Sequence, residues 1–194
     1  MELRSNYESC LRKNQADEAQ SPEATAFDSI YVTRVGHGLL HYAATMGKLN
    51  ALKHMIKTYV CNINLESQLQ YETPLVCACR SGQFDCAAFL IEAGARAVAS
   101  DIGEEAPLHW LGAFADGEIK PLARMLVAAG ADLEQPSGIG RRSMNADWEQ
   151  LFQVSVTPLG RAVLMKSLLA VRILLMLGAD PLLEKNLKRS SIGR

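Results

Sequence analysis

The sequence contains an internal repeat, and this repeat is the feature that most restricts the fold. Four segments of similar sequence follow one another along the 194 residues. They are GLLHYAATMG from Gly38, TPLVCACRSG from Thr73, APLHWLGAFA from Ala106 and TPLGRAVLMK from Thr157, with starts 35, 33 and 51 residues apart. The period is therefore about 33 residues with insertions in the first and third units. A period of roughly 20 to 50 residues indicates a stacked repeat architecture.

Each unit is expected to form two helices followed by an extended loop. A proline in the first turn of a helix costs no hydrogen bond and has a suitable φ angle, so Pro74, Pro107 and Pro158 indicate helix starts. Small residues follow, where one helix approaches the next, and an apolar stripe at helical spacing comes later in each unit. A glycine after this stripe in three of the four units suits the left-handed turn that ends a helix.

The repeated segment resembles the ankyrin repeat, which has the same period of about 33 residues. The Thr-Pro-Leu-His tetrapeptide of that family is matched at residues 73–75 and 157–159, and its histidine position holds His41, Val76, His109 and Gly160. The resemblance covers residues 38–189. It implies an all-α solenoid of about four helix-turn-helix units with finger loops, in which His41 and His109 bond to the backbone.

The repeats divide the chain into three parts. We expect an N-terminal helix and linker over residues 1–37, the repeat array over 38–189 and a C-terminal tail over 190–194. The units of the array span residues 38–72, 73–105, 106–156 and 157–189, and the third unit has an insertion at about 136–156. One helix pair cannot bury its own apolar face, so stacking of neighbouring units must stabilise the array.

The two ends of the array pose different problems. The N-terminal segment has apolar residues at helical spacing, so it either docks as a capping helix or remains a frayed tail. At the other end, the last predicted helix carries apolar residues where the family usually has polar ones, namely Leu168, Leu169, Met176 and Leu177. We expect this edge to be covered by further repeats of a longer chain, by a partner or by a second copy of the chain.

Composition argues against several function classes. With 20 Lys plus Arg against 21 Asp plus Glu, the formal net charge of −1 gives no basic field for nucleic acid or an anionic membrane surface. Five cysteines are too few for a disulfide framework, and the charged N-terminus lacks the apolar core of a signal peptide. The most apolar stretch, residues 168–179, falls short of the roughly 20 residues that span a bilayer. We therefore expect a cytoplasmic or nuclear protein.

The sequence shows no recognisable catalytic, cofactor or metal site. Cys77 and Cys79 would point to nearly opposite sides of a helix, and no second close Cys or His pair lies at zinc-ligand spacing. The segment GIGRRS at residues 138–143 lacks the third glycine of a dinucleotide fingerprint and the ending of a P-loop. No nucleophile with a base, carboxylate pair or open metal site can be recognised. We predict that the chain is not an enzyme and has no cofactor or metal.

The resemblance implies that a partner binds the finger tips and the exposed side of each first helix, which form a concave groove. This surface mixes arginine with large apolar side chains, which interface cores favour. The alternative for Met46, Phe114 and Met165 is partial packing against neighbouring units. The predicted partner-binding residues in the repeats are Arg34, His37, Met46, Leu69, Gln70, Glu72, Arg80, Ile102, Glu105, Phe114, Leu164 and Met165.

The insertion adds two further candidates. Its sequence NADWEQLF begins with Asn145 as a helix cap and places Trp148, Leu151 and Phe152 on one helix face. This face either folds over the gap between units or anchors a partner, and we include Trp148 and Phe152 among the predicted partner-binding residues.

The predicted function is a protein interaction module that binds a protein or peptide partner through the concave surface. An alternative is that the chain is the ankyrin segment of a larger protein and positions or regulates an effector or catalytic domain outside it. A third class is a structural oligomer assembled through the last helix. The fold leaves the partner's identity open because one fold hosts unrelated functions.

Overall fold

A computed structural model describes residues 31–34, 36–59, 61–137 and 156–182 of the chain. Most of the predicted N-terminal part and all of the predicted tail lie outside these residues. The described part contains eight helices and no strand longer than a single bridge. The helices are α3 (Leu39–Thr45), α4 (Leu49–Thr58), α5 (Pro74–Arg80), α6 (Phe84–Glu92), η1 (Pro107–Ala113), α7 (Asp116–Ala128), α9 (Pro158–Leu164) and α10 (Leu168–Leu177).

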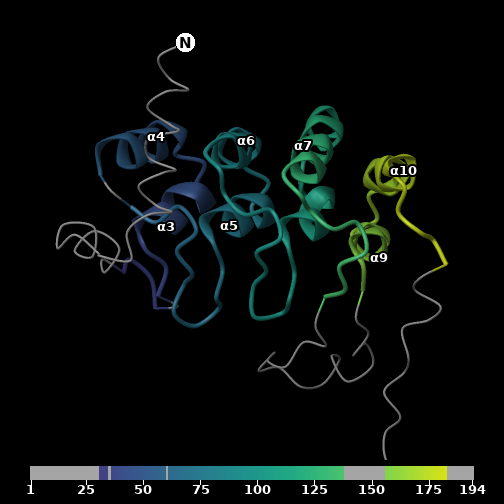
Figure 1. Cartoon of the computed structure of the whole chain (residues 1–194), viewed down its shortest axis with the longest axis horizontal. Coiled ribbons are helices and arrows are strands. Elements are labelled where there is room, and N and C mark those ends of the chain that lie inside the picture. The colour runs from purple at the N-terminus through teal and green to yellow at the C-terminus, as the bar shows by residue number, and fades with distance from the viewer. Residues whose placement is uncertain (1–30, 35, 60, 138–155, 183–194) are drawn as a thin grey trace, which may run out of the picture.

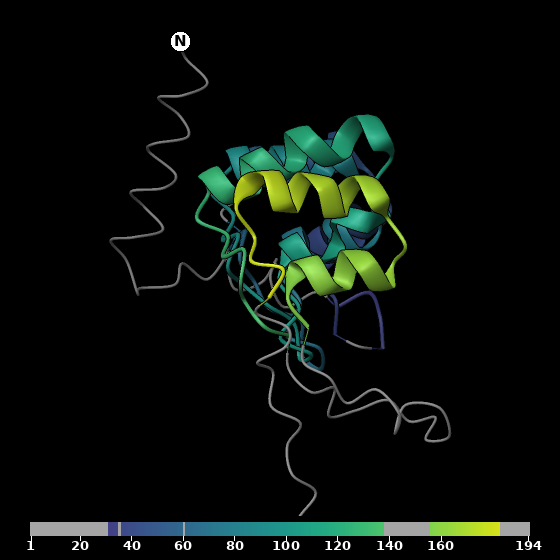
Figure 2. The same ribbon diagram turned by 90° about the vertical axis from the view of Figure 1, so that its right-hand side faces the viewer.

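The helices are arranged as four successive pairs in two layers. An inner layer of α3, α5, η1 and α9 lies beneath an outer layer of α4, α6, α7 and α10, and each inner helix contacts its neighbours in the row (Figure 1). Figure 2 shows the two layers from the end of the row, one above the other. The all-α solenoid that the repeat predicted is confirmed. The predicted limits of the individual units stay a prediction.

Small and branched apolar side chains form one core that runs through all four pairs. Ala44, Ala78 and Cys79 lie on the inner helices and are fully buried, so neighbouring helices approach closely there. Leucines from both layers fill the space between them, and those with almost no exposure include Leu52, Leu75, Leu90, Leu108, Leu122 and Leu174. No unit could bury these surfaces without its neighbours.

Local sequence explains where the helices begin and end. Thr73 caps α5 by accepting a hydrogen bond from the Val76 N–H at 3.4 Å, and Thr157 caps α9 in the same way. Pro74 then occupies the first turn, where its missing N–H costs nothing. At the end of α10, Gly178 has a φ of 104°, a left-handed conformation that glycine adopts without strain.

The third inner helix differs from the expected α-helix because it is a 3₁₀ helix. Gly112 lies near its end, and a Cβ atom built there would be only 3.0 Å from the Met165 Cβ of the next unit. Glycine is a weak helix former, and it allows the two backbones to approach closely. The tighter helix is followed by an extended Phe114, whose side chain turns into the core.

The predicted insertion leaves and rejoins the array at adjacent points. The Ser137 N–H donates to the Val156 carbonyl at 2.8 Å, and the Val156 N–H donates to Ser137 Oγ at 3.1 Å. Residues 138–155 between them, with Trp148 and Phe152, lie outside the described residues. Ser137 and Val156, the two residues that flank the insertion, are therefore adjacent, and η1 contacts α9 directly.

Candidate functional site

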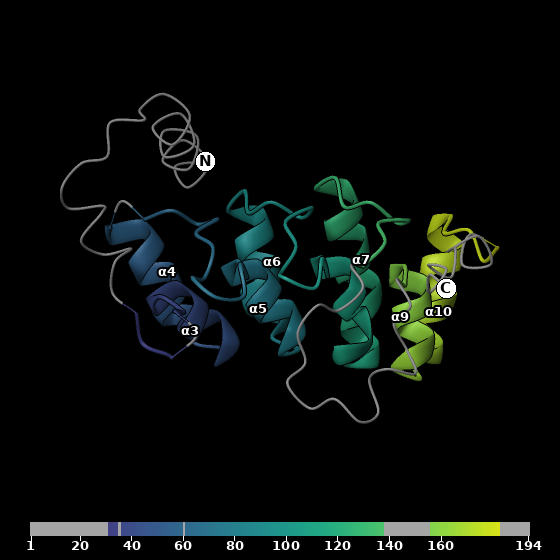
Figure 3. The same cartoon turned by 90° about the horizontal axis from the view of Figure 1, so that it is seen from below.

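The fingers form one continuous surface on the inner-helix side of the solenoid. Each finger joins an outer helix to the next inner helix, and Figure 3 shows the row from this side. Backbone hydrogen bonds connect neighbouring fingers, from the Gln68 N–H to the Gly36 carbonyl at 3.3 Å and from the Ile102 N–H to the Gln70 carbonyl at 2.8 Å. These bonds hold the finger tips at a fixed spacing.

Apolar side chains protrude from successive finger tips. Leu69 is 58% exposed and Ile102 is 44% exposed, while Gln70 between them is half-buried. Arg34 is exposed in the segment that precedes α3. We call this surface, made of Tyr31, Val32, Leu69, Tyr71 and Ile102, the finger ridge. Three residues of this surface were not predicted from the sequence, namely Tyr31, Val32 and Tyr71. Their large side chains at finger positions could have identified them.

The exposed ends of the inner helices add a second apolar area. Met46 at the end of α3 is exposed, and Leu164 at the end of α9 is 60% exposed. Met165 is half-buried and lies against Gly112 of the preceding unit, so its predicted alternative of partial packing applies. Tyr42 and Val163 are also exposed on these helices and were not predicted.

Three predicted partner-binding residues are inaccessible in this structure. His37 and Glu72 are buried, so the prediction that they are exposed is wrong, and Phe114 is buried, which agrees with its predicted alternative of packing against neighbouring units. Phe114 fills core space after the 3₁₀ helix. His37 and Glu72 turn toward each other beneath the first finger, because each residue directly precedes an inner-helix segment and stacking brings these positions together.

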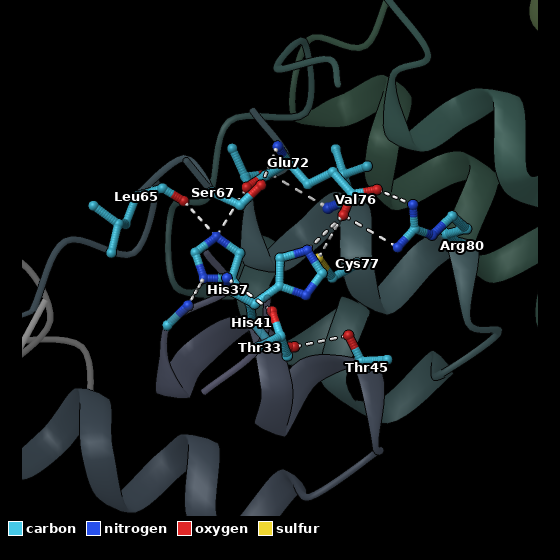
Figure 4. Close-up of polar contacts among 12 residues, drawn as sticks. Thr33, His37, His41, Thr45, Leu65, Ser67, Glu72, Val76, Cys77 and Arg80 are labelled. Carbon is cyan, nitrogen blue, oxygen red and sulfur yellow. Dashed lines mark hydrogen bonds and ion pairs between the residues drawn. The ribbon is translucent and has the colours of Figure 1, made fainter. Parts of the chain in front are cut away.

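Glu72 is the centre of a buried polar network (Figure 4). Its Oε2 lies 2.8 Å from His37 Nε2, and its carboxylate is bound by both terminal nitrogens of Arg80. The Cys77 thiol donates to the same Oε2 at 3.7 Å. The Arg80 side chain is 33% exposed, so the network extends from the interior to the protein surface. A buried carboxylate with these partners is compensated in charge and hydrogen bonding.

His41 ties the first finger to the array. Its Nδ1 accepts from the Gly38 N–H at 3.1 Å, and its Nε2 lies 2.8 Å from the carbonyls of Leu65 and Glu72. The predicted backbone role of this histidine is confirmed. Burial lowers the pKa of His41, which keeps the ring neutral and able to accept at Nδ1.

The comparisons with known proteins support this architecture. A family model described as ankyrin repeats, in three copies, matches residues 40–137, which is half of the chain. The chain belongs to the ankyrin repeat family. A search of curated proteins finds no match.

The matched ankyrin repeats include α3 to α7, and the fourth helix pair continues the same stacking. Helix α9 contacts η1 and α10 contacts α7, as in the earlier pairs. Ankyrin repeats are generally protein–protein interaction modules and are typically non-catalytic. Among the described residues of this array, no helix has both the length and the apolarity that crossing a bilayer requires.

A second charged group lies at the same repeat position, further along the ankyrin array. Glu105 is half-buried and pairs with Arg161 of the next unit at 3.2 Å, and the Arg161 guanidinium lies 4.7 Å from the centre of the Trp110 ring. Burial raises the pKa of Glu105, although the charge of Arg161 opposes this. Glu105 therefore joins two units through its ion pair, and only a small part of its side chain is exposed.

The buried network also contains a set of atoms that metal ions bind. His37, Glu72 and Cys77 each offer one ligand atom, and these atoms lie within 4.8 Å of one another. Burial, followed by the charge of Glu72, raises the pKa of Cys77 to about 12, so the thiol is not a ready nucleophile. Sequence reasoning paired Cys77 with Cys79 and overlooked His37, which lies 40 residues earlier.

Proposed function

We propose that this ankyrin array binds a protein or peptide partner through the finger ridge and the exposed ends of the inner helices. The observation that supports the proposal most is the row of apolar side chains on finger tips that backbone hydrogen bonds hold in register. Such side chains would lose contact with water on binding, which favours association. Arg34 at the edge would pair with an acidic group of the partner, whereas Arg80 stays paired with Glu72.

The experiment begins with peptides selected from a random display library on the folded chain. Their affinities are then measured for a Leu69→Glu, Ile102→Glu double variant and for an Ala51→Glu, Ala128→Glu control at exposed positions of the outer helices α4 and α7. We expect at least a tenfold loss of affinity in the finger variant and little change in the control, because a charge on the ridge opposes desolvation. Selected peptides that bind the finger variant as well as they bind the native chain would contradict the proposal.

We propose, as a second candidate, that the outer face of α10 is a self-association surface. Leu168 is 73% exposed and Met176 is 70% exposed on this helix, and Leu175 is also exposed. Leu169 and Leu177, which were predicted for the same surface, are half-buried and pack against the core, so they are poor choices for disrupting it. An exposed apolar patch of this kind favours an interface over solvent.

Light scattering over a range of concentrations tests this second candidate. We expect the native chain to increase in molar mass with concentration, and a Leu168→Lys, Met176→Gln variant to remain a folded monomer. If the native chain is monomeric at every concentration, this surface is not a self-association interface.

The location of the protein is also a proposal. Cys77, Cys79 and Cys86 are free, buried thiols. Free thiols fit a reducing compartment, so we propose the cytoplasm or the nucleus, which localisation of the tagged full chain would test.

A further inference from the structure

The underside of the first finger brings together three side chains of different metal-binding chemistry. They are a His37 nitrogen, a Glu72 carboxylate oxygen and the Cys77 sulfur, and all three residues are buried (Figure 4). His37 precedes α3, Glu72 ends the first finger, and Cys77 lies in α5. We propose that His37, Glu72 and Cys77 form a zinc-binding site between the first and second ankyrin units.

The spacing of the three atoms suits a single small ion. Glu72 Oε2 lies 2.8 Å from His37 Nε2 and 3.7 Å from Cys77 Sγ. Ligands at the usual zinc distances of roughly 2.0 to 2.3 Å have ligand-to-ligand separations of roughly 3.3 to 3.7 Å in a tetrahedral site. An ion between the three atoms therefore requires side-chain shifts of roughly 1 Å or less, without movement of the backbone.

The types of ligand favour zinc over other common ions. Calcium and magnesium take oxygen ligands, whereas nitrogen, sulfur and a single carboxylate oxygen together are a zinc set. Three protein ligands leave one tetrahedral position for a water molecule. The buried surroundings would keep that position from exchanging freely with solvent.

Neighbouring groups already orient the ligands. Arg80 binds the Glu72 carboxylate and fixes its plane. The His41 ring stacks on His37, with centroids 5.5 Å apart and an angle of 11° between the planes. Contacts of this kind to the first ligands are typical of metal sites, where they set ligand orientation.

The charges balance when zinc binds. The Cys77 S–H proton leaves to solvent. The proton that His37 Nε2 donates to Glu72 without metal is exchanged through solvent for one on Nδ1, so the neutral ring binds the ion through Nε2. The carboxylate and the thiolate then supply two negative charges against the two positive charges of the ion. Arg80 keeps its contact with the carboxylate and adds one net positive charge to the site, and its 33% exposed side chain leaves that charge in contact with water.

The same residues also form a hydrogen-bonded network without metal, so the test must detect direct ligation. The full chain is treated with chelator, kept in a non-thiol reductant and titrated with cobalt(II), whose thiolate complexes absorb in the near ultraviolet. We expect a thiolate-to-cobalt band that saturates at one equivalent and disappears when zinc is added. Absence of the band in folded protein would overturn the proposal.

Matched variants assign the band to this site. Cys77→Ser should lose the band and bind zinc at least tenfold more weakly, whereas Cys79→Ser, which changes an equally buried thiol on the same helix, should keep both. A band that persists in Cys77→Ser would overturn the assignment. If circular dichroism shows that Cys77→Ser does not fold, His37→Gln decides: loss of tight zinc binding supports the site and unchanged binding rejects it.

Discussion

At the scale of single residues, the position directly before each inner-helix segment determines the chemistry beneath the fingers. His37, Glu72, Glu105 and Val156 occupy this position in the four units. Stacking places these side chains between a finger and the inner layer, where an ionised group needs an opposite charge. Arg80 supplies that charge for Glu72, and Arg161 of the following unit supplies it for Glu105.

Removing the arginine partner of Glu72 should destabilise the array. We expect Arg80→Met to lower the free energy of unfolding by about 1 to 3 kcal/mol, because it leaves a buried carboxylate without its charged donor. Urea unfolding followed by circular dichroism measures the change. The exposed Arg96 offers a control, since Arg96→Met should stay within about 0.5 kcal/mol of the native chain. Equal effects of the two substitutions would contradict this account.

Acidification should destabilise the protein through its buried histidines. Burial lowers the pKa of His109 below its ordinary value of 6.5, and the charge of Arg161 acts in the same direction. The unfolded chain therefore binds more protons than the folded chain just below pH 6.5, so stability falls as the pH drops through that range. His41 acts in the same sense, whereas burial raises the pKa values of Asp101 and Glu105, which favours the folded state at lower pH.

Chemical denaturation at a series of pH values from about 7.5 to 5.5 measures this effect around the ordinary histidine pKa of roughly 6.5. The free energy of unfolding should decline less steeply in His109→Gln than in the native chain, whatever the stability of the variant at neutral pH. Identical slopes for the two proteins would show that His109 does not contribute.

Sequence alone could predict the repeat but not the contacts between equivalent positions. The spacing of the Thr-Pro-Leu segments predicts the stacked repeats. The place of His41 in the tetrapeptide predicted that its side chain hydrogen-bonds to the backbone. Periodicity places His37 and Glu72 at equivalent positions of neighbouring units, but the contact between their side chains depends on how far one unit rotates against the next, which the sequence does not state. A comparison of residues one period apart would have brought the two together as candidates.

At the scale of elements, caps determine where the inner helices begin. Thr73 and Thr157 accept from the N–H three residues later, whereas His41 and His109 use ring Nδ1 to accept from the N–H three residues before them. The units thus alternate between two capping devices at equivalent sites. The 3₁₀ form of η1 was not predicted, because its sequence PLHWLGA begins with the same proline as the α-helical units.

Loss of a threonine cap should cost about 1 kcal/mol. We expect Thr73→Ala to lower the unfolding free energy by that amount, because the Val76 N–H is then buried without its acceptor. Thr58→Ala, at the exposed end of α4, should have an effect of less than about 0.5 kcal/mol. Thermal and urea unfolding measure the stabilities of both variants. Equal stabilities of Thr73→Ala and Thr58→Ala would contradict this role of the Thr73 cap.

At the scale of the whole molecule, the array is a row of nearest-neighbour contacts. Each helix pair contacts chiefly the pair before it and the pair after it. Stability is then a sum of unit terms and interface terms, so damage at one interface should stay local.

Gly112→Val tests this locality. A side chain at Gly112 would meet Met165 and Ser167 at 3.0 to 3.3 Å, so it should loosen the contact between η1 and α9. We expect amide exchange in α9 and α10 to accelerate at least tenfold while α3 to α6 keep their protection. Gly117→Val is the control, because nothing lies within 4 Å of a Cβ there. Uniform acceleration across all helices would indicate a single cooperative unit instead.

The hydrogen-bonded pair of Ser137 and Val156 makes the third finger a position at which the intervening sequence can be replaced. Because Ser137 and Val156 are hydrogen-bonded to each other, the sequence between them does not have to span a distance between the two flanking units. Lengthening a flexible loop costs little free energy, roughly 0.6 kcal/mol for each doubling. Evolution or an engineer could therefore exchange residues 138–155 for a different sequence while the stacked helices on either side keep their register.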